Sequence, residues 1–272
     1  MPHVLHTVHG LSFTASRRRL VNNAYVLLER YAAKRCHTLV GVADAMNKAM
    51  LDAGIGKAHQ YETVYSGMAT GAFTSAVDQR PAVRQALRLA DDDVAVVTVA
   101  RLFDMKGHDD LLSHAERLCQ QHPNLRFVWV GDGSLRPRFE RQIAEMGLQD
   151  RFRLVGLVPP EDVPRYVAAC DVLAHPSRRE GLARALPQGQ LARLPVVTYD
   201  IDGNAEGLLP GKSGFALPAF DVDAFVARIS ELVADAQRRH AMGDAGQAFA
   251  VNRFSTETMV RRLEDVYRRD VG

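Results

Sequence analysis

Short apolar runs alternate with stretches of helical apolar spacing along most of this chain. Between residues 94 and 199 the runs predict five buried strands, at residues 94–100, 125–130, 152–156, 171–174 and 195–199. Helices are predicted at residues 108–121, 160–169 and 221–234, and a further helix is predicted to end at about residue 146. Glycine and proline mark the short loops between these elements. Strands alternating with helices predict an α/β fold built on a doubly wound parallel sheet.

The first eighty residues follow the same alternation but supply fewer elements. Apolar runs predict strands at residues 2–8, 38–42 and 62–68, and a helix is predicted at 43–53. A further helix is predicted from apolar positions at Leu20, Ala24, Leu27, Leu28 and Tyr31. About three strands and two helices are few for an independent α/β domain, so we interpret this region as the second half of one. Residues 74–92 are predicted to form a linker with a short helix.

The loop at residues 177–188 organises the larger region. It follows one predicted strand and precedes a helix, which is where open α/β sheets bind ligands and where helix N–H groups favour anions. Arg178, Arg179 and Glu180 suit a phosphate-bearing ligand with hydroxyl groups, and Gly181 lets the backbone approach that ligand. A plain alternative is a charged helix start, with Glu180 favoured in the first turn by the helix dipole.

Other loops are predicted to reach the same edge of the sheet. If the strands are parallel, the loops beginning at Arg101, Gly131, Gly156, Ser177 and Asp200 open together. The charged residues collected there are Arg101, Lys106, Asp132, Arg178, Arg179, Glu180 and Asp202. Two cations beside a helix N-terminus are what a diphosphate requires.

Composition limits the classes of function. The chain has 272 residues with a formal charge of +2, which does not indicate nucleic acid as a partner. Residues 1–80 hold nine Lys and Arg against five Asp and Glu, a pattern that fits phosphates or an anionic membrane surface and is also common for solubility. Three cysteines without disulfide or zinc spacing indicate a reducing cytoplasm. No apolar run approaches the roughly 18–20 residues that span a bilayer.

Several cofactor chemistries lack their motifs. No G-x-G-x-x-G follows a strand and no P-loop sequence occurs, which argues against a nicotinamide enzyme and a P-loop enzyme. Acidic pairs at residues 91–93, 200–202 and 221–223 suggest a metal, but the first precedes a strand and the third opens a helix. His3, His6 and His9 alternate along a strand, and His9 beside Gly10 is either a site residue or a hydrogen-bonded structural histidine. We expect no metal.

An ordered series of short motifs carries a family resemblance. The motifs occupy residues 99–107, 130–133, 155–156, 171–177, 180–181, 194–197, 203–206, 214–215 and 253–255, followed by a final helix to about residue 269. Together they resemble glycosyltransferase family 4 (group 1), whose members have the GT-B architecture of two Rossmann-like doubly wound parallel-sheet domains.

The resemblance implies a division of the chain into three parts. Residues 1–80 would form a partial N-terminal, acceptor-side domain, and residues 81–252 the donor-binding domain. Residues 253–272 would form a helix that packs back toward the N-terminal domain. Because the family's N-terminal domain begins well upstream of the strand at 2–8, we expect this chain to lack the first part of that domain.

The resemblance also implies a reaction and its residues. Family members transfer a sugar from a nucleoside-diphosphate sugar, here expected to be a UDP-sugar, to an acceptor hydroxyl with retention, without a bound metal or other cofactor. Arg101 and Lys106 would bind the donor diphosphate, and Glu180 the donor-sugar hydroxyls. His9 matches a histidine that faces the reacting sugar, so His9 and Glu180 are the candidate catalytic residues. The other donor-binding candidates are Gly133, the backbone at Leu157 and Val158 beside the base, the N–H groups of Gly181, Leu182 and Ala183, and Gln188.

One site residue departs from the family pattern, and several questions stay open. Gln188 replaces the second glutamate of the family's E-x7-E motif, which binds the ribose, so we expect altered affinity rather than lost binding. We expect a glycan or lipid-linked acceptor, although polysaccharides, lipid-linked carriers and small molecules all stay open as acceptors. The expected location is cytoplasmic, with peripheral membrane contact left open. The alternatives are a non-catalytic sugar-nucleotide-binding module and, less favoured, a nucleotide-sugar epimerase, which would need a second acid/base group near the sugar.

Overall fold

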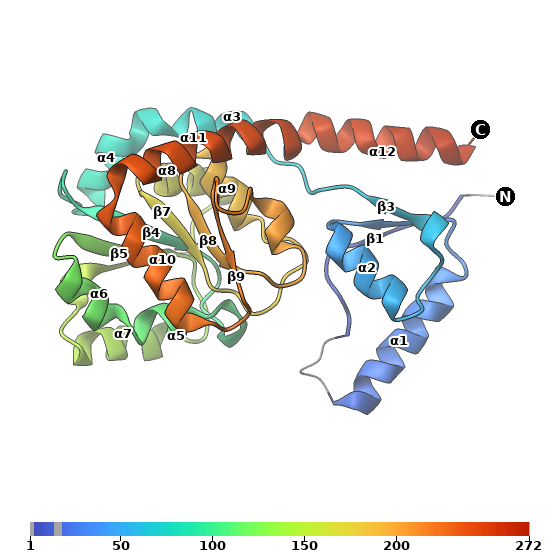
Figure 1. The fold of residues 1–272 in the computed structure, drawn as a ribbon, viewed down its shortest axis with the longest axis horizontal. Coiled ribbons are helices and arrows are strands. Elements are labelled where there is room, and N and C mark those ends of the chain that lie inside the picture. The colour runs from blue at the N-terminus through green and yellow to red at the C-terminus, as the bar shows by residue number, and fades with distance from the viewer. Residues whose placement is uncertain (1–2, 14–17, 272) are drawn as a thin grey trace.

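The chain forms two parallel sheets of unequal size. The computed structural model describes residues 3–13 and 18–271. The smaller sheet has the order β1 (Leu5–Val8), β2 (Thr38–Gly41) and β3 (Tyr61–Thr63). It carries α1 (Arg19–Ala33), α2 (Asp44–Asp52) and the 3-10 turn η1 (Ala58–Gln60). Figure 1 shows this smaller domain in blue beside the larger one.

The larger sheet has six parallel strands, in the order β6-β5-β4-β7-β8-β9. Their bounds are β4 (Val94–Val99), β5 (Leu125–Val130), β6 (Phe152–Gly156), β7 (Val172–His175), β8 (Val196–Tyr199) and β9 (Gly214–Leu217). This order is the doubly wound Rossmann order, in which the chain reverses direction across the sheet between β4 and β7. The predicted α/β fold class is confirmed.

Helices cover both faces of the larger sheet. The connections are η3 (Asp104–Lys106), α5 (His108–Leu112), α6 (Ala115–Gln121), α7 (Arg136–Glu145), η4 (Gln149–Arg151), η5 (Pro160–Asp162), α8 (Val163–Ala168), α9 (Ala185–Leu191), η6 (Asn204–Gly207), α10 (Val222–Ala234) and α11 (Ala236–Arg253). Along β4, Val94 and Val96 join one buried cluster, and Ala95 and Val97 join the other. A strand buried on both faces reads as a continuous apolar run, which explains why the sequence predicts these strands well.

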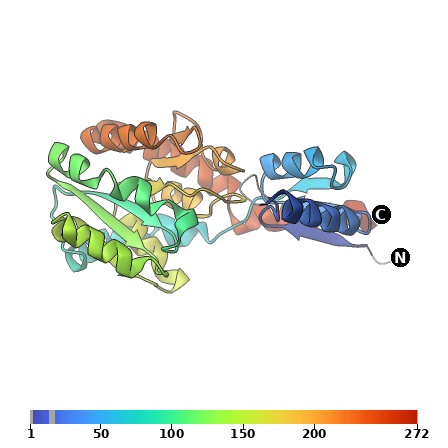
Figure 2. The same ribbon diagram turned by 90° about the horizontal axis from the view of Figure 1, so that it is seen from below.

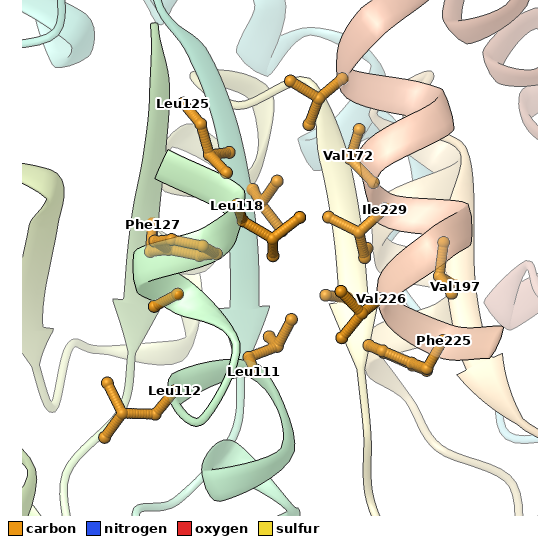
Figure 3. Packing of buried hydrophobic residues seen from close by; sticks show 14 of the residues in the cluster. Leu111, Leu112, Leu118, Leu125, Phe127, Val172, Val197, Phe225, Val226 and Ile229 are labelled. Atoms are coloured by element: carbon orange, nitrogen blue, oxygen red, sulfur yellow. The ribbon is translucent and has the colours of Figure 1, made fainter. Parts of the chain in front are cut away.

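The first of these clusters is the largest core of the molecule. Figure 3 shows Leu111 and Leu118 from α5 and α6 beside Ile229 and Val226 from α10, all over the strands. Trp129 on β5 is fully buried in the same cluster. Because this core fixes the strands, the loops at their carboxyl ends have a rigid base.

The chain crosses between the two domains twice. The first crossing follows β3 and leads into α3 (Thr70–Thr74), η2 (Ala76–Gln79) and α4 (Arg80–Ala86), which lie on the larger domain. The second joins α11 to α12 (Thr256–Val271), which runs beside the smaller domain in Figures 1 and 2. The N–H of Met68 donates to the carbonyl of Phe254 at 2.9 Å, so the two crossings are hydrogen-bonded.

Four local predictions differ from the structure. Residues 74–92, expected to form a linker with a short helix, contain η2 and α4, which follow directly on α3. The helix expected at 108–121 is broken into α5 and α6, where the side chains of Ser113 and His114 bond to the carbonyl of Asp110. The edge strand β9 was not predicted. The helix after the loop at 177–188 begins only at Ala185, so Glu180 does not lie in its first turn and the plain alternative is wrong.

Helix α1 turns its apolar stripe outward. Leu20, Leu27, Leu28 and Tyr31 are between 59% and 84% exposed, although their spacing predicts a buried face. The side that faces the smaller sheet holds Val26 and the buried Ala33 instead. The helix therefore presents an apolar face that nothing in the described residues covers.

Candidate active site

A cavity of about 500 Å³ opens at the point where the larger sheet reverses direction. The residues lining it are His9, Val42, Ser66, Val99, Ala100, Arg101, Lys106, His175, Glu180, Leu182, Ala183, Arg184, Ala185 and Gln188. The first three belong to the smaller domain and its crossing, and the others end β4 and β7 or follow them. The cavity therefore lies between the domains at the carboxyl ends of the strands, where ligands bind in this class of sheet.

The loop after β4 brings two cations to this cavity. Arg101 lies two residues after the end of β4, and Lys106 ends the η3 turn. The next residue, Gly107, has φ +69°, and a Cβ there would lie 1.9 Å from the carbonyl oxygen of Pro176. Only glycine allows this left-handed turn and this close approach to the loop after β7. Gly107 thus sets Lys106 against the loop that carries Glu180.

Glu180 is held by two donors on one oxygen. Its Oε1 accepts from Lys106 Nζ at 2.6 Å and from His175 Nε2 at 2.9 Å. Burial alone would raise the pKa of this carboxyl, but the hydrogen bond from His175 and the charges of His175 and Lys106 outweigh burial and lower the pKa to about 2. Within the part of the chain that the structure describes, no hydrogen bond is made to Oε2. Glu180 is therefore an ionised, oriented carboxylate with an oxygen available to a hydroxyl.

The backbone of the Glu180 loop is anchored to the loop after β8. The N–H of Glu180 donates to Asp202 Oδ2 at 2.8 Å, and the N–H of Ala183 donates to Asn204 Oδ1 at 3.2 Å. Asn204 in turn donates to Thr198 Oγ1 at 3.1 Å. Asp202 adopts φ +49°, and burial raises the pKa of its carboxyl. The backbone of the Glu180 loop is thus held by two side chains from the exit of β8.

A match to a known family identifies the class of protein to which this chain belongs. A family model described as "Glycosyl transferases group 1" matches residues 79–249, which is more than half of the chain. The chain belongs to the group 1 glycosyltransferases. Its two parallel-sheet domains are the GT-B fold of this family.

Two curated relatives of this group 1 chain act on lipid-linked acceptors, according to their names. It is 28% identical over 258 residues to a "GDP-mannose-dependent alpha-(1-6)-phosphatidylinositol monomannoside mannosyltransferase" of Mycolicibacterium smegmatis, covering 92% of this chain and 63% of the relative. It is 26% identical over 270 residues to a "UDP-Gal:alpha-D-GlcNAc-diphosphoundecaprenol alpha-1,3-galactosyltransferase" of Escherichia coli, covering 98% and 69%. The chain thus spans about two thirds of the length of these relatives.

A solved structure shows the same fold. Anabaena Alr3699/HepE in complex with UDP is 23% identical and has a TM-score of 0.84, over 98% of this chain and 72% of that chain.

In the described part of this group 1 chain, no helix is both long and apolar enough to cross a bilayer.

The structure brings together seven of the eleven candidate residues of this group 1 chain. His9, Arg101, Lys106, Glu180, Leu182, Ala183 and Gln188 line the cavity. Gly133 instead packs against the backbone of Leu102, and Leu157 and Val158 lie on the loop after β6, outside the cavity lining. The role of Leu157 and Val158 beside the base, and that of Gly133 in donor binding, therefore stay predictions.

Contacts of the Glu180 loop bear on three expectations from the sequence. Arg178 donates to Asp110 Oδ1 at 2.6 Å and Arg179 donates to the carbonyl of Leu11, so neither guanidinium lines the cavity. The N–H of Ala183, expected to face sugar or phosphate, is engaged by Asn204. A Cβ on Gly181 would lie 2.4 Å from the carbonyl oxygen of His9. The approach of the smaller domain alone requires a glycine at this position, and the expected approach to a ligand stays a prediction.

Sequence reasoning missed two residues of this site. Arg184 adds a third cation to the cavity, and its only signal in the sequence was its place nine residues after a strand. His175 is the last residue of β7, is 3% exposed, and orients Glu180. It occurs within a motif of the family resemblance, yet only the structure shows its contact with the carboxylate.

The acidic pairs have structural partners. Asp93 pairs with Arg126 at 2.9 Å, and Asp221 caps α10 by accepting from the N–H of Ala224 at 3.0 Å. Among the described residues, no group of three or more His, Cys, Asp or Glu side chains is placed to hold a metal ion. The boundary roles predicted for the first and third pairs agree with these contacts.

Proposed function

We propose that this chain transfers a sugar from a UDP-sugar to an acceptor hydroxyl, with retention at the anomeric carbon, in the synthesis of a glycan, a lipid-linked carrier or a cell-envelope polysaccharide. The observation that carries this proposal is one cavity that joins three cations to an ionised carboxylate. Arg101, Lys106 and Arg184 supply the cations and Glu180 the carboxylate, and His9 faces them from the other domain.

These residues have distinct roles in the proposed reaction. The bond between the anomeric carbon and the diphosphate oxygen breaks, and its electron pair leaves with the diphosphate. Arg101 and Lys106 stabilise the negative charge that develops there. Glu180 Oε2 accepts a hydrogen bond from a donor-sugar hydroxyl and orients the ring, and Gln188 binds the ribose. The acceptor oxygen bonds to the anomeric carbon from the same face, and its proton passes to the departing diphosphate.

Calorimetric binding of UDP and GDP tests whether the base of the donor nucleotide is uracil. The names of structurally similar proteins include complexes with UDP and UDP-glucose, and the Escherichia coli relative is named for UDP-Gal. We expect UDP to bind with a dissociation constant in the micromolar range, and GDP roughly tenfold or more weakly. A preference for GDP, as the name of the mannosyltransferase suggests for that protein, would overturn the UDP assignment. Binding of neither nucleotide would overturn the donor site.

A transfer assay separates enzyme from binding module. Incubation with radiolabelled UDP-sugars and a sugar-diphosphopolyprenol acceptor is expected to move label to the acceptor. Nucleotide binding without transfer to any acceptor would favour the non-catalytic module. Release of a UDP-sugar epimer would favour the epimerase.

We also propose that α1 contacts an anionic membrane surface, near a lipid-linked acceptor. Leu27 and Tyr31 border a hollow of about 700 Å³ whose basic lining residues are Arg30, Lys34, Lys57 and His59, with no acidic side chain. Exposed apolar side chains among cations suit the boundary between lipid head groups and acyl chains. The outward apolar stripe of α1 is thereby explained.

Vesicle flotation tests the membrane proposal. We expect the chain to float with phosphatidylglycerol-containing vesicles and not with pure phosphatidylcholine, and Leu27→Glu to reduce the bound fraction several-fold. Val77→Glu is the matched control, because Val77 is 54% exposed on η2 of the larger domain. Absence of binding, together with a dimer that Leu27→Glu dissociates, would assign this face to a second copy of the chain and overturn the proposal.

A further inference from the structure

Helix α2 of the smaller domain has no cap from its own segment. Its N-cap residue is Ala43, which is extended at φ −156° and offers no side-chain acceptor. The first N–H groups of a helix need partners. Here Asp44 N donates to Glu206 Oε2 at 2.8 Å and Ala45 N donates to Glu206 Oε1 at 2.7 Å. A carboxylate on η6 of the larger domain thus caps a helix of the smaller one.

The same carboxylate contacts the first chain crossing directly and is linked to the second through Tyr65. Tyr65, on the first crossing, donates its hydroxyl to Glu206 Oε2 at 2.8 Å. Arg253, at the end of α11, donates to the Tyr65 hydroxyl at 2.5 Å and lies 4.2 Å from the centre of its ring. Burial and the hydrogen bond to Glu206 raise the pKa of Tyr65, so the phenol stays a donor. Glu206 is therefore the centre of a network that joins three segments.

The backbones of the two domains meet beside this network. A Cβ on Gly203 would lie 2.3 Å from Ala43 Cβ, and the N–H of Gly203 donates to the carbonyl of Gly181 at 2.8 Å. Gly181 in turn touches the carbonyl of His9. The contact between the domains at Glu206 is therefore connected, through Gly203 and Gly181, to His9 and Glu180, which line the cavity from opposite domains.

We propose that Glu206 is a positioning residue that latches the smaller domain onto the larger one and so sets His9 opposite Glu180. The latch needs a carboxylate, because two backbone N–H groups require two acceptor oxygens and the positive helix terminus favours a negative charge. Its effect on turnover rests on the proposed function, whereas its effect on the arrangement of the domains does not.

The test compares Glu206→Gln with Glu231→Gln. Glu231 also accepts from two donors, Arg228 and Arg238, but all three lie in the larger domain. In Glu206→Gln we expect amide exchange in residues 43–53 to accelerate about tenfold, the cost of one hydrogen bond to a charged group. The radius of gyration from small-angle scattering should increase. The value of kcat should fall about tenfold while the affinity for UDP changes less than threefold, and Glu231→Gln should leave all four quantities unchanged.

Each outcome decides one question. Unchanged exchange at residues 43–53, or an unchanged radius of gyration, overturns the latch even if the parent chain transfers sugar. A loss of UDP affinity equal to the loss of kcat overturns the positioning role and assigns Glu206 to the donor site. If the parent chain neither binds UDP nor transfers sugar, the proposed function fails while exchange and scattering still test the latch.

Discussion

Lys106→Ala is expected to weaken UDP binding roughly 10- to 100-fold, which is the range for losing a charge-assisted hydrogen bond. In our proposal, Lys106 donates to the diphosphate as well as to Glu180 Oε1, which it already contacts at 2.6 Å. Turnover should fall further, by about 10²- to 10³-fold, because charge on the leaving group is greatest in the transition state. Isothermal calorimetry with UDP and initial rates with the UDP-sugar measure the two effects.

Lys48→Ala is the matched control for this substitution. Lys48 pairs with Asp52 at the same distance of 2.6 Å, but its side chain is 74% exposed on α2, away from the cavity. Such a surface pair contributes little, so both binding and turnover should stay within about twofold. An Lys106→Ala variant that binds UDP as tightly as the parent would contradict the assignment of this cavity to the diphosphate.

Most strands of the larger sheet could be predicted from the sequence because they are buried on both faces. Their apolar runs are continuous, and parallel pairing brings their exit loops to one edge as predicted. The edge strand β9 escaped prediction because it has four residues, begins with Gly214, and only that residue is buried. Short, half-exposed strands lack the pattern on which prediction depends.

The partners of the site residues were less predictable than their location. A loop rich in arginine suggested a phosphate site, yet Arg178 is committed to Asp110, which the sequence does not show. Glu206 stood in a recognisable motif, but its partners Asp44 and Ala45 are more than 160 residues away. Contacts between domains depend on how whole sheets pack against each other. Local patterns of residues therefore do not show which residues distant in the sequence will meet.

Glu180→Gln is expected to lower kcat about 10²- to 10³-fold while UDP binding is kept or becomes tighter. UDP lacks the sugar that Glu180 orients, and loss of the carboxylate frees Lys106 for the phosphates. A lower kcat with an unchanged or higher affinity for UDP distinguishes the role of Glu180 from that of Lys106, because loss of Lys106 lowers the affinity for UDP. Glu140→Gln is the control, because Glu140 makes a surface pair with Arg136 and is 51% exposed. Equal loss of UDP affinity in Glu180→Gln would contradict a role at the sugar.

The same variant should change the pH dependence of stability in a defined window. The pKa of Glu180 is about 2 in the folded chain against an ordinary 4.5, so its ionised form stabilises the fold above pH 4.5. That stabilisation is lost as the pH falls from 4.5 toward 2, and between pH 7 and pH 3 the loss is about 2 kcal/mol. Urea unfolding should therefore show the parent losing about that much more stability than Glu180→Gln over this interval, whereas Glu140→Gln should follow the parent. Parallel curves for the parent and Glu180→Gln would mean that Lys106 and His175 do not hold the carboxylate in its charged form.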